Sequence, residues 1–67
     1  MCNFLVNGYN YQTESTITIL DLINYFDYNT TLLILEYNSQ ICHRKNWDNI
    51  IVRENDKIEM ITIVGGG

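Results

Sequence analysis

The chain has 67 residues, of which 46% are hydrophobic and 18% are charged, and its formal net charge is −4. A chain of this length forms one small domain that buries only about 60% of the surface it exposes when unfolded. It has no room for a deep cleft between domains, so we expect a protein that is not an enzyme by itself. We also do not expect nucleic-acid binding, because it needs a stripe of Lys and Arg on the surface and the four basic residues form no such stripe.

The cysteine content indicates a reducing compartment, and the short apolar runs predict no segment that spans a membrane. Cys2 and Cys42 are too few for the disulfide framework of a small secreted domain. One bridge between them is arithmetically possible, but two free apolar thiols are favoured. The N-terminus shows no signal-peptide pattern. The longest apolar run, residues 32–35, is far shorter than the roughly 20 residues that span a bilayer.

The first two predicted elements form a β-hairpin. Alternation of apolar residues predicts a strand over residues 1–6. Asn7-Gly8 then predicts a type I′ turn, because both central positions of that turn need a positive φ. Residues 9–14 are expected to return as a strand that is polar enough to lie at a sheet edge.

The apolar spacing changes to that of a helix over residues 19–28. One face would carry Ile19, Leu22, Ile23 and Phe26. Thr18 and Asp21 have the spacing of a capping box at the start, and Asn29 can adopt the left-handed conformation that ends a helix. A helix of about ten residues is marginal alone, so this one must dock on a sheet.

The remaining chain predicts further strands over residues 32–37, 50–52 and 57–64, with a short segment at 40–42. Trp47 is expected to anchor a helical turn between them. One helix cannot cover two sheet faces, so the expected fold is α+β, a mixed sheet of four to five strands with the helix packed across one face. The first and last strands would lie at its centre. This element order resembles the β-grasp (ubiquitin-like) fold, with a domain over residues 1–64 and a flexible C-terminal glycine tail over 65–67.

The tail is the feature that suggests chemistry. Gly65, Gly66 and Gly67 have no side chains, so the tail can enter a narrow channel. Its one reactive group is the carboxylate of Gly67, which must be activated as an acyl-phosphate or acyl-adenylate before a nucleophile attacks it. A frayed terminus without function has the same composition. A β-grasp element order ahead of the tail favours a second hypothesis, in which the small domain is carried between enzymes by this carboxylate.

The sheet face opposite the helix is predicted to bind a partner. If the alternate residues of the central strands face the helix, the others form an exposed apolar patch that leads to the tail. The predicted partner-binding residues are Leu5, Ile34, Ile61, Ile63 and Val64. A slip of one residue in register would invert these faces, and a loop or an oligomer partner could cover the patch instead.

Other polar residues give weaker signals. Cys42 and His43 predict no metal site, because neighbours on a strand point to opposite faces and no second pair of ligands follows. Arg44 is expected to hold the irregular segment around Trp47. A solvated acidic stretch is expected at Glu54, Asp56 and Glu59.

Six segments spread along the chain carry a specific pattern. They are Asn7-Gly8, TILDLI at 18–23, LEYN at 35–38, the I-x-x-R-x-x-W spacing of residues 41–47, DKIE at 56–59 and IVGGG at 63–67. In this order they resemble the ThiS family, the sulfur carrier proteins of thiamine biosynthesis. Two positions depart from the family pattern. His43 stands where the family usually has Pro, and Asn55 stands where it usually has Gly, although Asn also tolerates a positive φ.

The resemblance implies that the chain is a protein cosubstrate. It would contribute no catalytic side chain and would bind neither a metal nor a cofactor. An adenylating enzyme related to the ubiquitin-activating enzymes (ThiF type) would use ATP to form an acyl-adenylate on Gly67. A sulfur donor such as a cysteine desulfurase would convert it to a thiocarboxylate, and thiazole synthase (ThiG type) would receive the sulfur. The expected location is the bacterial cytoplasm or the plastid stroma, because a chain without Ala or Pro and rich in Asn, Ile and Tyr is typical of an AT-rich genome.

Three alternatives stay open. The chain could be a sulfur carrier of another pathway, the small subunit of molybdopterin synthase or the carrier of tRNA thiolation. It could also be a ubiquitin-like modifier joined to lysines through Gly67, or an interaction module with an inert tail. The V-G-G-G end and the lack of Pro favour the thiamine carrier.

Overall fold

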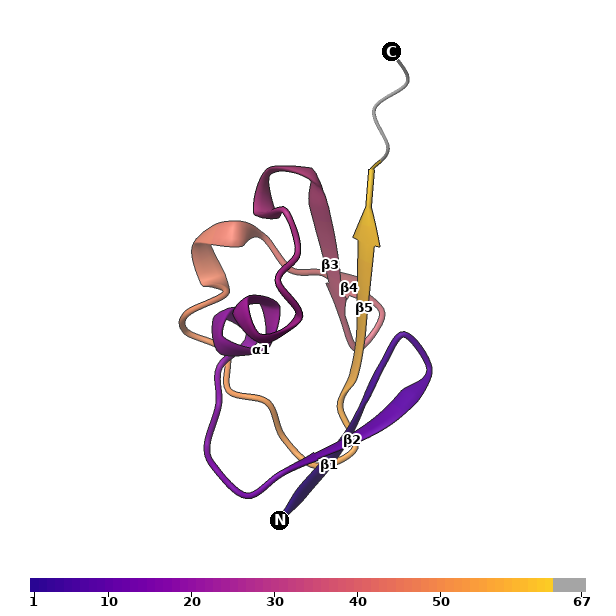
Figure 1. Cartoon of the computed structure of the whole chain (residues 1–67), viewed down its shortest axis with the longest axis vertical. Coiled ribbons are helices and arrows are strands. Elements are labelled where there is room, and N and C mark those ends of the chain that lie inside the picture. Colours follow the sequence, from indigo (N-terminus) through magenta and orange to yellow (C-terminus); the bar gives the residue numbers. More distant parts are fainter. Residues whose placement is uncertain (64–67) are drawn as a thin grey trace.

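A five-stranded sheet with one helix across one face makes up the computed structural model, which describes residues 1–63 (Figure 1). The strands lie in the order β2-β1-β5-β3-β4. The elements are β1 (Cys2–Val6), β2 (Tyr9–Thr13), α1 (Ile19–Phe26), the 3-10 turn η1 (Thr30–Leu32), β3 (Leu33–Tyr37), β4 (Gln40–Ile41), the 3-10 turn η2 (Arg44–Asn46) and β5 (Lys57–Thr62). The α+β, β-grasp expectation is confirmed.

The N-terminal hairpin forms as the sequence predicts. β1 pairs antiparallel with β2, and Val6 lies opposite Tyr9 across the turn. Asn7 and Gly8 have φ values of 51° and 84°, as a type I′ turn requires. A Cβ atom on Gly8 would meet nothing within 4 Å, so the positive φ rather than crowding selects glycine there.

β5 is the central strand, parallel to β1 on one side and antiparallel to β3 on the other. The Asn7 side chain extends the parallel pairing by one step. Its amide oxygen accepts from the Met60 N–H at 2.8 Å, and its amide nitrogen donates to the Met60 carbonyl at 3.3 Å. An amide side chain can replace a backbone unit in this way because it carries both a donor and an acceptor.

α1 begins with the predicted capping box and ends earlier than predicted. The Asp21 N–H donates to the Thr18 hydroxyl at 3.1 Å, and the Thr18 N–H donates to the Asp21 carboxylate at 2.9 Å. The predicted helix over 19–28 stops at Phe26 because Asp27 adopts the left-handed conformation, with φ 59°. Its N–H bonds to the carbonyls of Ile23 and Asn24, which closes the last turn.

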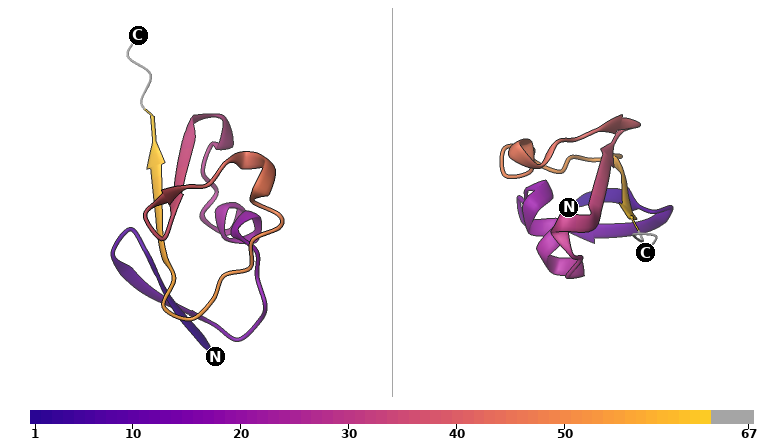
Figure 2. Two further views of the ribbon diagram at one scale, coloured as in Figure 1. Left: turned by 180° about the vertical axis from the view of Figure 1, so that it is seen from behind. Right: turned by 90° about the horizontal axis from the view of Figure 1, so that it is seen from above.

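The hydrophobic core lies between α1 and the sheet, and the η2 segment closes one side of it (Figure 2). Trp47 anchors that segment as predicted, since only 3% of it is exposed and its indole N–H donates to the Cys42 carbonyl at 3.0 Å. The Arg44 guanidinium lies 5.7 Å from the centre of the Trp47 ring and donates to the Thr30 carbonyl. The remaining buried apolar residues are Phe4, Val6, Ile19, Leu22, Ile23, Leu33, Leu35, Cys42, Val52, Ile58 and Met60.

The predicted strands are longer than the observed ones. Those over 1–6, 9–14 and 32–37, and the short segment at 40–42, each exceed the observed strand by one residue. The predicted strand over 50–52 is a single bridge between Ile51 and Thr18. The predicted strand over 57–64 ends at Thr62, although the Ile63 N–H still bonds to the Leu32 carbonyl at 2.8 Å. Val64, which the prediction included, lies outside the described residues.

Candidate functional site

The predicted reactive tail, Gly65 to Gly67, lies outside the described residues. The structure shows the segment that leads to it. β5 runs through the middle of the sheet and ends, at Thr62, far from Met1 (Figure 1). The bond from Ile63 to Leu32 fixes the backbone one residue further along.

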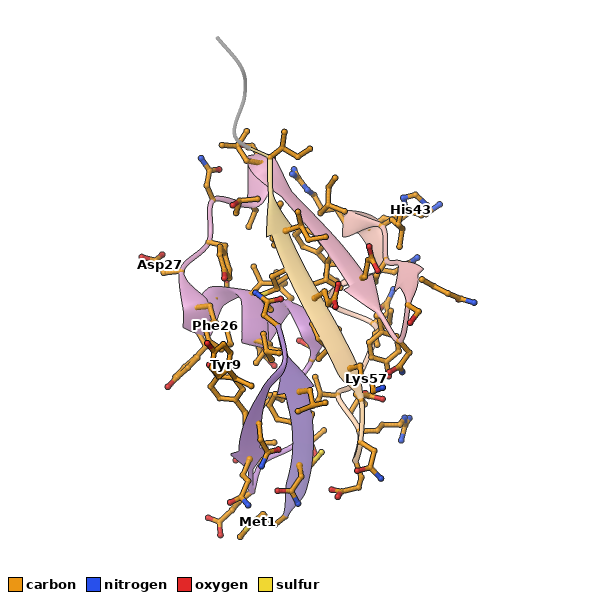
Figure 3. All side chains as sticks on the ribbon, turned by 90° about the vertical axis from the view of Figure 1, so that its right-hand side faces the viewer. Met1, Tyr9, Phe26, Asp27, His43 and Lys57 are labelled. Carbon is orange, nitrogen blue, oxygen red and sulfur yellow. The ribbon has the colours of Figure 1, made fainter. Side chains whose placement is uncertain are left out.

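The sheet face opposite α1 carries the predicted partner-binding residues of β3 and β5. Figure 3 looks onto this face. Along β5, Ile58 and Met60 are buried against the helix, whereas Lys57, Glu59 and Ile61 are exposed. The burial pattern therefore agrees with the alternation expected from the sequence. That this face binds a partner stays a prediction.

Three of the predicted residues come together at the end of this face. Ile34 lies directly opposite Ile61 in the β3–β5 ladder. Ile61 is 44% exposed and Ile63 is 50% exposed, while Ile34 is half-buried. We call these three side chains, Ile34, Ile61 and Ile63, the apolar end of the open face.

Leu5 does not join them. It pairs with Lys57, four positions before Ile61 on β5, which corresponds to about 13 Å along a strand. The prediction of one continuous patch is wrong at this residue, because the register between β1 and β5 places Leu5 at the other end of the strand. Leu5 is half-buried.

Ile41 is an exposed apolar residue that was not among those predicted for this face. It lies opposite Glu36 on the neighbouring strand and is 64% exposed. Cross-strand partners point to the same face, so Ile41 belongs to the open face. The two-residue turn at Asn38 and Ser39, where both φ values are positive, was the signal that could have placed it.

An acidic pair separates the apolar end from Leu5. Glu36 and Glu59 are direct partners in the β3–β5 ladder. An antiparallel ladder alternates hydrogen-bonded and non-hydrogen-bonded residue pairs. The Asn38 N–H bonds to the Lys57 carbonyl and the Ile63 N–H bonds to the Leu32 carbonyl, so both of these are hydrogen-bonded pairs. Glu36 and Glu59 therefore also form a hydrogen-bonded pair, in which the Cα atoms lie about 5.5 Å apart. Like charges directly opposite each other repel, so the two carboxylates destabilise each other across the ladder.

Asp56 is buried, which contradicts the expected solvated acidic stretch. It is 7% exposed and accepts three hydrogen bonds, from the Tyr37 hydroxyl at 2.7 Å, the Asn38 amide at 3.1 Å and the Arg53 N–H at 2.7 Å. Burial first, and then the hydrogen bond to Asp56, raises the pKa of Tyr37 to about 12. This cluster holds the turn that starts β5.

Neither cysteine forms a disulfide. Cys42 is buried, and burial raises the pKa of its thiol, which disfavours the nucleophilic thiolate. His43 is exposed with φ −70°, the value that proline favours, so the bend survives the departure from the family pattern. Asn55 has φ 68°, so that turn survives as well.

Across residues 1–63, no three His, Cys, Asp or Glu side chains gather as metal ligands would. In the same part of the chain, the one α-helix is too short to cross a membrane.

The comparisons with known proteins identify the family. The model of the ThiS family matches residues 3–67. The chain belongs to the ThiS family. Members of this family are small sulfur carrier proteins rather than catalytic enzymes.

Relatives from Trieres chinensis, Porphyra purpurea and Pyropia yezoensis carry the name ycf40. The ycf40 protein of Trieres chinensis is 58% identical over 64 residues, which cover 96% of this chain and 88% of that protein. The ycf40 protein of Porphyra purpurea is 32% identical over 62 residues, covering 92% and 87%.

The ThiS thiamine biosynthesis protein of Geobacter metallireducens has the same fold. Its crystal structure superimposes with a TM-score of 0.82 over 97% of this chain and 99% of that chain, at 22% sequence identity. The solution structure of a thiamine biosynthesis protein from the same organism gives a TM-score of 0.78 over 97% and 87%, also at 22% identity.

Proposed function

We propose that this chain carries sulfur for thiamine biosynthesis as a thiocarboxylate on Gly67. A carboxylate is a poor electrophile, so an adenylating enzyme of the ThiF type first joins it to AMP, with ATP as substrate and pyrophosphate as the leaving group. The outer sulfur of a persulfide on a donor such as a cysteine desulfurase then attacks the acyl carbon and displaces AMP. A thiol cleaves the resulting acyl disulfide, which releases the thiocarboxylate and leaves the two thiols joined as a disulfide; free sulfide would displace AMP in one step. The observation that carries the proposal is membership of the ThiS family over residues 3–67, which includes the glycine tail.

The chain supplies no reacting side chain and no bound cofactor in this proposal. Gly65 and Gly66 give the reach and the narrow cross-section that let Gly67 enter an active site. ATP is consumed by the partner enzyme. The sulfur then passes to a thiazole synthase of the ThiG type.

The apolar end of the open face is the proposed docking surface for these enzymes, together with Val64, the next residue along the chain. It is supported by two isoleucines that are about half exposed beside the segment leading to the tail. The Glu36–Glu59 pair beside it favours a partner surface with Lys or Arg. Leu5 and Ile41 would lie at the margin of this contact.

The plastid stroma is the proposed location. The relatives from Trieres chinensis and Porphyra purpurea are named ycf40, a name used for proteins of algal plastid genomes. The Asn- and Ile-rich composition without Ala or Pro supports the same origin.

The direct test is the intact mass of the chain after incubation with a ThiF-type enzyme, ATP and sulfide. Replacement of one oxygen by sulfur at the C-terminus is expected. A thiazole synthase supplied with the substrate that accepts the sulfur should then restore the original mass, because an oxygen replaces the sulfur that leaves. Deletion of Gly67 is the control, since it should abolish the reaction and leave thermal unfolding unchanged. An unmodified wild-type chain with active enzymes, or sulfur uptake by the deletion variant, would refute the proposal. Chains joined to lysines of other proteins would show a modifier instead.

A further inference from the structure

The outer edge of β2 carries free backbone hydrogen-bonding groups. In β1, the Leu5 N–H donates to the Asp56 carbonyl at 2.8 Å and the Asn3 carbonyl accepts from Asn55 at 2.7 Å, so both residues direct their backbone groups away from β2. Their partners on β2 are Asn10 and Gln12. In an antiparallel ladder, the partners in such pairs also point away, so Asn10 and Gln12 direct both N–H and C=O out of the sheet.

This edge lacks the features that usually protect an exposed strand. Sheet edges are commonly shortened, or blocked by Pro or by a charged side chain. β2 has five residues, Tyr-Asn-Tyr-Gln-Thr, with no charge and no Pro. The opposite edge of the sheet, β4, has only two residues. β2 is therefore the longer of the two edges that can accept another strand.

A cavity of about 310 Å³ lies between β2 and α1. Its lining is largely apolar and aromatic, and the rings of Tyr11 and Phe26 meet edge to face with centroids 5.3 Å apart. Tyr9 and Phe26 mark this side of the molecule in Figure 3. A strand added to β2 would direct every second side chain toward this cavity, because successive side chains alternate between the faces of a sheet.

The charged side chain that lines the cavity is acidic. Asp21 is among its lining residues and none of them is basic. Residues 1–43 contain no Lys or Arg, while Glu14 follows β2 directly and Asp27 follows α1. An occupant with Lys or Arg beside its apolar side chains would complement this negative surface.

We propose that β2 and the cavity beside it bind an extended segment of a partner protein, with alternating apolar side chains and at least one Lys or Arg, added to the sheet as a further strand. Backbone bonds to Asn10 and Gln12 would fix the segment, and the cavity and Asp21 would select its side chains. β1 lies between this site and β5, where the apolar end of the open face begins, and the cavity is on the helix side of the sheet rather than on the open face. A partner could therefore stay bound at β2 while the other surface is engaged. The inference does not rest on the sulfur-carrier proposal.

The test uses a phage-displayed library of random twelve-residue peptides selected on the wild-type chain. We expect enriched sequences with apolar residues at every second position and an excess of Lys and Arg. Their synthetic forms should shift the NMR amide signals of Asn10, Gln12 and residues of α1. No enrichment above uncoated wells, enrichment of acidic peptides, or shifts confined to the open face would overturn the proposal.

A matched pair of variants isolates the backbone contact. Gln12→Pro removes one outward N–H but no bond to β1, and Pro is tolerated at sheet edges. Gln12→Ala removes the same side chain and keeps the N–H. We expect about a tenfold loss of peptide affinity in Gln12→Pro relative to Gln12→Ala. Equal affinities in two folded variants would contradict strand addition.

The charge contribution is tested with Asp21→Asn, which keeps an oxygen to accept from the Thr18 N–H. Affinity for a basic peptide should fall about twofold to fivefold at low salt. An unchanged affinity would refute the role of Asp21. If wild type forms a dimer that Gln12→Pro abolishes, a second copy of the chain occupies the edge, and the proposed partner is wrong.

Discussion

The buried carboxylate of Asp56 shows how one residue fixes the start of the central strand. Its three donors come from two different parts of the chain, Tyr37 and Asn38 at the end of β3 and Arg53 in the preceding turn. The Asn38 amide oxygen accepts in addition from the Lys57 N–H at 2.8 Å. A buried carboxylate is stable only when such bonds replace its water, so the turn geometry and the β3–β5 register depend on each other.

Tyr37→Phe tests this cluster. Burial, and then the hydrogen bond to Asp56, raises the pKa of the Tyr37 hydroxyl from its ordinary value of 10.0 to about 12 in the folded protein. The folded state therefore holds this proton more tightly, and its contribution to stability is present below pH 10 and is lost as the pH rises toward 12. We expect wild type to lose free energy of unfolding faster than Tyr37→Phe over that range.

The measurement is urea unfolding of both proteins from pH 7 to pH 12. The other tyrosines are common to both, so the difference between the two curves isolates Tyr37. At pH 7 the variant should be less stable by about 1–3 kcal/mol, because Asp56 loses a donor. Parallel curves across pH 10 to 12 would contradict the assignment.

The burial of Asp56 was not predictable from the local sequence. Three polar residues in a row, Glu54 to Asp56, are typical of a solvated turn. Glu54 and Asn55 are exposed as that pattern indicates. Asp56 differs because Tyr37, which is 19 positions away, covers it in the tertiary structure.

At the level of elements, α1 depends on its N-terminal cap because it has only eight residues. Thr18→Ala removes the hydroxyl that accepts from the Asp21 N–H and should lower the free energy of unfolding by about 1 kcal/mol. Thr16→Ala is the matched control, since Thr16 is exposed and lies outside the cap. Equal losses in the two variants, measured by urea unfolding, would show that the cap contributes nothing.

The Glu36–Glu59 pair predicts that part of the open face is electrostatically strained. Glu59→Gln removes one of two like charges on adjacent strands, so the free energy of unfolding should rise by about 0.2–1 kcal/mol at low salt. The gain should shrink near 1 M salt, where the Debye length is about 3 Å. A variant that is less stable than wild type at low salt would refute the repulsion.

Element types followed from the sequence more closely than element lengths. The hairpin turn, the helix face and the capping box depend on neighbours within a few residues, so local pattern predicts them. The predicted strand over 50–52 is wrong because the backbone of these residues forms hydrogen bonds with the residues around the start of α1 rather than with a strand of the sheet. The Ile19 N–H donates to the Ile50 carbonyl at 2.9 Å, and the Val52 N–H donates to the Ile17 carbonyl at 2.9 Å.

At the scale of the whole molecule, the candidate surface was predictable within one pair of strands but not across the sheet. Alternation placed Ile34, Ile61 and Ile63 correctly, because burial of one face fixes the other. Leu5 was misplaced because the parallel register of β1 and β5 is set by contacts about 50 residues apart in sequence. No local pattern contains that register.

The surface itself is tested by Ile61→Asp. Ile61 is 44% exposed, so the substitution should change the free energy of unfolding by less than about 1 kcal/mol. It places a charge directly opposite Ile34, where the proposed contact needs an apolar surface. Affinity for the ThiF-type enzyme should therefore fall about tenfold or more, as expected for a residue near the centre of an interface.

Thr62→Asp is the control, because it adds the same charge one residue away and lies opposite Leu33, on the helix-facing side of β5. Its affinity for the enzyme, measured by calorimetry, should remain near that of wild type. Equal weakening in both variants would show that net charge rather than the open face governs binding. If Ile61→Asp unfolds the chain while Thr62→Asp does not, Ile61 supports the core and the proposed docking surface is wrong.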